Sequence, residues 1–158
     1  MTYRVTGLRH AEFAPYFTMS DDELLDHRAR RLLADTEPGF PCRVSLRDAG
    51  EGEEVLLVNF TSHPVETPFR SSYAIYVRKG ATAPAEYRDE PPPFFGHRNL
   101  SLRAFDEEGM LETAMLVAPG EADEAIRTLF DRSEVAYIHA HFAAYGCFAA
   151  RIDRDGDA

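Results

Sequence analysis

The sequence predicts a single α+β domain, in which a mostly antiparallel β-sheet has about three helices packed on one side. Its 158 residues are enough for one hydrophobic core. Segments with the pattern of strands greatly outnumber the helices that could connect parallel strands, which favours antiparallel pairing. Apolar residues make up 44% of the chain and charged residues 28%, and this balance is typical of a folded protein.

The first part of the chain predicts a strand followed by helices. Residues 3–8 have a strand pattern, and residues 11–17 suit a short helix or turn. Residues 20–33, SDDELLDHRARRLL, have a helical pattern, in which Ser20 caps the first turn and Glu23 completes a capping box. The side of this helix that we expect to face the core holds Leu24, Leu25, Arg28 and Leu32.

The rest of the chain predicts a series of strands and one helix. The strand candidates are residues 42–46, 55–60, 73–78, 100–105, 111–117, 135–142 and 147–152. The helix candidate is residues 119–131, and its core-facing side holds Ala125, Ile126, Leu129 and Phe130. We expect one globular domain over residues 1–158, with a proline-rich loop at 81–99 and a disordered tail at 154–158.

Charge and cysteine content narrow the classes of partner. Lys and Arg number 17 and Asp and Glu number 27, which gives a net charge of −10. This charge repels nucleic-acid phosphates and anionic lipids, so we expect no nucleic-acid partner and no membrane partner. The chain has no apolar run of the length of a signal peptide or a membrane span. With two cysteines far apart in sequence, it predicts a cytoplasmic protein with free thiols.

Five stretches of the sequence resemble one known family. They are GFPCRVSLRDA (39–49), VLLVNF (55–60), PFRSSYAIYVR (68–78), RNLSLRAFDEEGM (98–110) and AYIHAHFAAYGCFAARIDR (136–154). In this order they resemble bacterial domain-of-unknown-function family 1203. The resemblance implies a bacterial protein of one compact domain, and it implies no activity. Where the family pattern has an asparagine directly after His-x-His, this chain has Phe142.

Two histidines and a cysteine mark the last predicted hairpin, residues 137–152. Side chains alternate along a strand, so His139 and His141 point to the same side. If the apolar residues of both strands face the core, the connecting loop has an odd number of residues, such as 144–146. In that register the side opposite the core holds Tyr137, His139, His141, Cys147 and Arg151.

This histidine face supports three interpretations. His139, His141 and Cys147 are ligand types that zinc prefers, and three protein ligands leave one open position for catalysis. Cys147 could instead act as a nucleophile with His141 as its base. The third interpretation is structural, with the face exposed to solvent or covered by the proline-rich loop. Because the spacing matches no well-defined zinc motif, we expect no cofactor, and a zinc-like divalent metal is the alternative.

Arginines within the strand segments form a second group of candidates. A guanidinium group presents a planar fork of donors that fits a carboxylate or a phosphate. The candidate ligand-binding residues are Arg43, Arg70, Ser71, Arg103 and Arg151. Their structural alternative is ion pairing with aspartates. If the histidine hairpin pairs with residues 100–105 or 42–46, the histidines converge with Arg103 and Arg43.

Three classes of function follow. The first is a binding protein or enzyme for a small anionic ligand, with arginines holding the ligand and His139 or His141 transferring a proton. The second is a metal-binding protein. The third is a non-catalytic interaction domain whose acidic surface meets a basic partner or a second copy in a homodimer. The sequence has no P-loop, GxSxG or HExxH motif, and it leaves open whether the chain is an enzyme.

Overall fold

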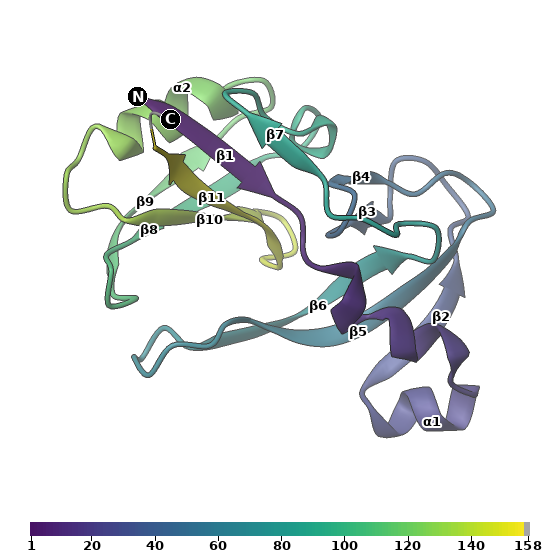
Figure 1. Ribbon diagram of the computed structural model, residues 1–158. Coiled ribbons are helices and arrows are strands. Elements are labelled where there is room, and N and C mark those ends of the chain that lie inside the picture. The colour runs from purple at the N-terminus through teal and green to yellow at the C-terminus, as the bar shows by residue number, and fades with distance from the viewer. Residues whose placement is uncertain (157–158) are drawn as a thin grey trace.

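A computed structural model of the protein describes residues 1–156 and contains two β-sheets (Figure 1). One sheet has six strands in the order β7-β1-β11-β10-β8-β9, and the other has five in the order β2-β5-β6-β3-β4. Neighbouring strands are antiparallel, except for the parallel pair of β3 and β6. In Figure 1 the long β5–β6 hairpin extends from the five-stranded sheet to lie beneath the six-stranded one.

The six-stranded sheet is covered on one face by a helix. Its strands are β1 (Thr2–Thr6), β7 (Glu86–Arg88), β8 (Leu100–Phe105), β9 (Leu111–Val117), β10 (Tyr137–Phe142) and β11 (Phe148–Asp155). The helix α2 (Ala122–Phe130) and the short 3-10 turn η3 (Pro93–Phe95) supply apolar side chains to this face. Ile126 and Leu129 of α2 pack there with Leu102 and Ile138, so the larger hydrophobic core lies between helix and sheet.

The five-stranded sheet carries the N-terminal segment. Its strands are β2 (Ala29–Leu33), β3 (Pro41–Cys42), β4 (Arg47–Asp48), β5 (Glu54–His63) and β6 (Ser71–Arg78). Two 3-10 turns, η1 (His10–Glu12) and η2 (Ala14–Thr18), and the helix α1 (Asp21–Asp26) precede β2. Phe13 and Leu24 from this segment pack on Val58 and Ile75, which forms a second hydrophobic cluster. Within residues 1–156, no helix is long and apolar enough to cross a bilayer.

The predicted α+β class is confirmed in its coarse form, and its details need correction. Residues 1–156 form two α-helices instead of about three, and two sheets instead of one. The helix predicted over residues 20–33 begins with the expected capping box of Ser20 and Glu23 but ends at Asp26. Arg28 then adopts a left-handed backbone with φ of 54°, and residues 29–33 pair with β5 instead.

Two other segments also differ from their prediction. Residues 42–46 were predicted as a strand. The strand β3 contains only Pro41 and Cys42, because the chain then turns back, with Leu46 at a φ of 54°. The predicted loop at 81–99 contains β7 and η3. Of the predicted tail, Arg154 and Asp155 belong to β11, and residues 157–158 lie outside the described residues. The predicted hairpin of β8 and β9 and the core face of α2 are confirmed.

One buried guanidinium group connects the two sheets. Arg43, directly after β3, is 1% exposed. Its Nε donates to the carbonyl of Phe148 at 2.8 Å, and its Nη1 donates to the carbonyl of Pro41 at 2.6 Å. Its Nη2 donates to Sγ of Cys147 at 3.0 Å, and the group lies 5.0 Å from the ring centroid of Phe142. Arg43 therefore joins β3 of one sheet to the β10–β11 hairpin of the other.

Replacing Arg43 by methionine should lower the free energy of unfolding by about 3 kcal/mol, because two carbonyl groups lose a charged donor inside the protein. Urea unfolding measures this loss. Arg70→Met is the matched control, since Arg70 is exposed and pairs only with exposed Glu66. Equal stability losses in the two variants would show that Arg43 does not hold the sheets together.

Candidate functional site

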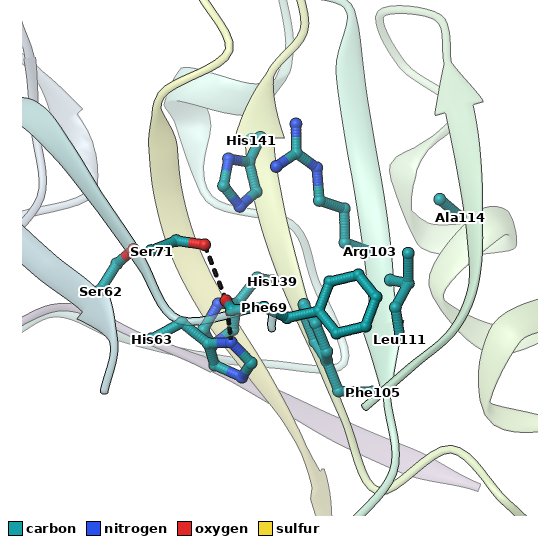
Figure 2. A pocket seen from close by; sticks show the side chains of 10 residues that line it. All are labelled: Ser62, His63, Phe69, Ser71, Arg103, Phe105, Leu111, Ala114, His139 and His141. Atoms are coloured by element: carbon teal, nitrogen blue, oxygen red, sulfur yellow. Dashed lines mark hydrogen bonds between the residues drawn. The ribbon is translucent and has the colours of Figure 1, made fainter. Parts of the chain in front are cut away.

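A cavity of about 210 Å³ lies between the six-stranded sheet and the β5–β6 hairpin (Figure 2). Its lining consists of Ser62, His63, Phe69, Ser71, Arg103, Phe105, Leu111, Ala114, His139 and His141. The three histidines and Phe105 are the buried residues of this lining. Leu111 and Ala114 are exposed and lie on the edge strand β9, so the cavity opens toward that edge.

Strand pairing explains why the histidines meet an arginine here. Strand β10 pairs with β8 in a register that sets His139 opposite Arg103 and His141 opposite Ser101. Residues directly opposite each other in an antiparallel pair place their side chains on the same face. Strand β8 is thus the partner of the histidine strand, one of the two possibilities that the sequence left open, and this pairing brings Arg103 to both histidines.

Cys147 does not join the histidines, so the predicted composition of that face is wrong for this residue. Ala140 pairs with Ala150, whereas His141 pairs with Phe148, and Ala149 is therefore an extra, bulged residue. The bulge puts Phe148 on the histidine face, with its ring 5.0 Å from that of His139.

The thiol of Cys147 therefore lies on the helix-side core, where its Sγ accepts from Arg43. The residues of the predicted metal site, His139, His141 and Cys147, are accordingly divided between two faces. Over the described residues 1–156, no group of three or more His, Cys, Asp or Glu side chains is arranged to hold a metal ion.

His63 fastens the β5–β6 hairpin over the cavity. Its Nδ1 lies 2.9 Å from the carbonyl of Phe69, and its Nε2 lies 2.7 Å from the hydroxyl of Tyr137. A carbonyl only accepts, so Nδ1 carries the proton and Tyr137 donates to Nε2. Burial raises the pKa of Tyr137, which keeps that proton on its oxygen. The His63 ring also packs 4.2 Å from the ring of Phe105.

The sequence did not single out His63, because a lone histidine three residues after the predicted strand 55–60 carries no motif. In the structure, strand β5 extends to His63 and has a bulge between Thr61 and His63. The structural interpretation expected the histidine face to be exposed to solvent or covered by the proline-rich loop. The cover is the β5–β6 hairpin, as Figure 2 shows through the position of His63, Phe69 and Ser71.

His141 presents an unprotonated nitrogen. Its Nδ1 lies 2.9 Å from the carbonyl of Gly146 and must donate to it, which leaves Nε2 as an acceptor. Burial lowers the pKa of His141 to about 4, although the bond to Gly146 opposes this shift. The imidazole is therefore neutral at neutral pH.

His139 is the more deeply buried histidine, at 2% exposure. Burial and then the neighbouring His63 lower the pKa of His139 to about 2, so its ring is also neutral. No residue between 1 and 156 forms a hydrogen bond with its ring nitrogens, although aromatic rings surround it. Ser62, also in the cavity lining, has a buried Oγ that lacks a partner in the described part of the chain.

Arg103 is the only charged residue in the lining of this cavity. Its Nη1 donates to the hydroxyl of Tyr73 at 3.1 Å, and its Nε donates to Oγ of Ser101 at 3.3 Å. Both partners are neutral, and no carboxylate of residues 1–156 pairs with it. Figure 2 shows the guanidinium group beside the ring of His141. The cavity thus contains one half-buried positive charge without a counter-ion.

The other predicted ligand-binding residues separate into two groups. Ser71 lines the cavity and donates its hydroxyl to the carbonyl of Phe69 at 2.8 Å. Arg151 lies opposite His139 on β11, but its guanidinium stacks 4.0 Å from the ring of Tyr137 and pairs with Asp153. Arg43 and Arg70 lie away from the lining, the first within the connection between sheets and the second at the surface.

Phe142, which replaces the asparagine implied by the family resemblance, points away from the cavity. Its ring centroid lies 5.0 Å from the guanidinium group of Arg43 and 4.9 Å from that of Arg98. It packs in the helix-side core with Phe94 at 5.2 Å. This departure from the family pattern therefore changes the core and leaves the cavity lining as it is.

Mild acid should destabilise the fold through His139 and His141. A histidine in the unfolded chain has a pKa near 6.5, whereas the folded pKa values are about 2 for His139 and about 4 for His141. At a pH between the folded and unfolded values, the unfolded state therefore binds more protons than the folded state. The stability is therefore fully present above pH 6.5 and is lost as the pH falls toward 4. Urea unfolding should show a loss of about 2 kcal/mol per histidine between pH 7 and pH 5.

The variant His139→Gln should lose less stability over this pH range than the unchanged protein. His27→Gln, at an exposed position after α1, is the matched control and should behave like the unchanged protein. An identical pH dependence in the unchanged protein and in His139→Gln would show that burial of this histidine is not coupled to folding.

The sequence of the chain was compared with protein families, curated proteins and solved structures, and one family matches. No curated protein and no solved structure matches the chain. Residues 39–154 match the family described as protein of unknown function (DUF1203). This stretch starts before β3 and includes every residue of the cavity lining. The chain therefore belongs to the DUF1203 family, as the five stretches of resemblance predicted.

Proposed function

We propose that the cavity binds a small anionic molecule and that Arg103 is the residue that holds it. The observation that carries this proposal is the half-buried guanidinium group without a counter-ion. A charge removed from water is costly unless it is paired. Several other arginines of this acidic protein pair with carboxylates, as Arg78 does with Glu53 at 2.6 Å. Arg103 meets only hydroxyl groups, and an anionic ligand would supply the missing partner.

The surroundings of Arg103 support this role. The hydroxyls of Tyr73 and Ser101 orient its fork and leave Nη2 for a ligand. The lining has no acidic residue that would repel an anion. The half-buried position of Arg103 also makes an ion pair formed there stronger than one at the open surface. The predicted binding residues Arg103 and Ser71 thus belong to one cavity with His139 and His141.

His141 is the better placed of the two histidines predicted to transfer a proton. Its Nε2 is an unprotonated acceptor next to Arg103, so a ligand held by the arginine lies within its reach. We propose His141 as the base of any reaction at this site. The free thiols of Cys42 and Cys147 support the further proposal of a reducing compartment such as the cytoplasm.

Anion binding can be tested by amide NMR shifts. Titration with acetate, benzoate and inorganic phosphate should shift amides of β8 and β10 for at least one of these anions. Arg103→Gln should abolish the shifts while the thermal unfolding temperature changes little, because only hydrogen bonds to two hydroxyls are lost. Arg70→Gln is the control for the surface charge and should bind normally.

The proposal fails if none of the three anions shifts these amides. It also fails if Arg103→Gln binds them as well as the unchanged protein does.

A further inference from the structure

The volume of the cavity limits the ligand to a small molecule. The cavity measures about 210 Å³. An engineered protein cavity of about 150 Å³ accommodates benzene, so this one has room for a single ring and a few further atoms. Nucleotides and sugar phosphates are too large to be enclosed here.

The charge of the lining favours a monoanion. Arg103 is its one charged side chain. The buried imidazoles of His139 and His141 are neutral, since burial holds the pKa of each well below 7. A single carboxylate would balance the guanidinium group. A dianion such as phosphate or a dicarboxylate would leave one negative charge in a poorly hydrated place, which is costly.

The walls of the cavity favour a flat apolar body. Phe69, Phe105, Leu111 and Ala114 line it, and the two phenyl rings lie 6.3 Å apart at 68° to each other. Aromatic rings pack well against such tilted faces and edges. A carboxylate on Arg103 with an aromatic ring against these walls would fill the space.

Several polar atoms in the lining lack a hydrogen-bond donor among residues 1–156. The Nε2 of His141 is an unprotonated acceptor, and the buried Oγ of Ser62 has no partner within residues 1–156. The Oγ of Ser71 already donates to Phe69 and can still accept. A ligand hydroxyl would satisfy one of these atoms, whereas an unsubstituted ring would leave all of them unpaired.

From size, charge, walls and acceptors together we infer that the ligand is an aromatic monocarboxylate with a ring hydroxyl, of the size of a hydroxybenzoate. This inference rests on the proposed anion site at Arg103 and adds the chemical class of the ligand. The carboxylate binds Arg103, the ring lies against Phe69 and Phe105, and the hydroxyl donates to His141 or Ser62.

Calorimetric titration with a graded set of probes tests the class. The probes are acetate, benzoate, the three hydroxybenzoates, phthalate, phenol and inorganic phosphate. Benzoate should bind at least about tenfold more tightly than acetate, because the ring buries apolar surface. At least one hydroxybenzoate should bind roughly fivefold more tightly than benzoate, which corresponds to one net hydrogen bond. Phthalate, phosphate and phenol should bind more weakly than benzoate.

Two variants locate the hydroxyl. His141→Phe keeps a ring but removes Nε2, and Ser62→Ala removes a hydroxyl that has no partner, so the second variant should fold even if the first does not. One of them should reduce the preference for a hydroxybenzoate over benzoate. Arg103→Gln should remove the binding of every probe.

The outcomes separate this inference from the function on which it rests. If acetate or phosphate binds as tightly as any hydroxybenzoate and Arg103→Gln abolishes the binding, the aromatic class is wrong and the anion site stands. The same holds if both hydroxyl variants fold and keep the full preference. If no probe binds, or if Arg103→Gln binds the probes unchanged, both proposals are wrong.

Discussion

A charged side chain can be buried only where fixed hydrogen-bond partners replace its water. Arg43 meets this condition with two backbone carbonyls and a sulfur atom, contributed by β3 on one side and the β10–β11 hairpin on the other. Because these acceptors belong to different sheets, satisfying the guanidinium group requires the sheets to meet in one arrangement. His139 and His141 of the cavity lining belong to the same β10–β11 hairpin, so their position depends on the same contacts.

The surfaces that face each other across the cavity differ from an ordinary core. The helix side of the six-stranded sheet is closely filled by apolar side chains. The opposite side holds His139, His141 and Arg103, and the β5–β6 hairpin meets it through His63. Polar side chains with fixed hydrogen-bond directions cannot interdigitate as freely as apolar ones. The space left between them is the cavity, and its lining includes the buried Oγ of Ser62, which lacks a partner within residues 1–156.

Features of the fold that depend on the local sequence could be predicted, whereas features that depend on contacts between distant segments could not. The helix α2 and the β8–β9 hairpin follow from apolar spacing and a turn, and the pattern shows both. The early end of α1 depends on the pairing of residues 29–33 with β5, a contact between distant segments that outweighs the helical pattern. The bulge at Ala149 adds one residue, so a strict period of two assigns Cys147 to the wrong side.

The candidate site could likewise be predicted only in part from the sequence. His139, His141, Arg103 and Ser71 were identified from the sequence and line one cavity. The pairing of β10 with β8, which brings the first three together, was only one of two possibilities that the sequence left open. The hairpin that covers them could not be predicted. A lone histidine such as His63 acquires its role only from the hydroxyl of Tyr137, which comes from a strand far along the chain.

The net charge of −10 also determines how this site would select its ligand. A surface with excess negative charge does not attract anions from a distance, and salt screens its field beyond about 8 Å. Affinity must therefore arise within the cavity, from direct contact with Arg103 after water has been displaced. Such short-range recognition favours ligands that also bury an apolar part in the cavity. The ion pair alone contributes little to the binding free energy where water reaches it. A half-buried arginine at the end of an aromatic-walled cavity thus suits a carboxylate that carries a ring better than a bare inorganic anion.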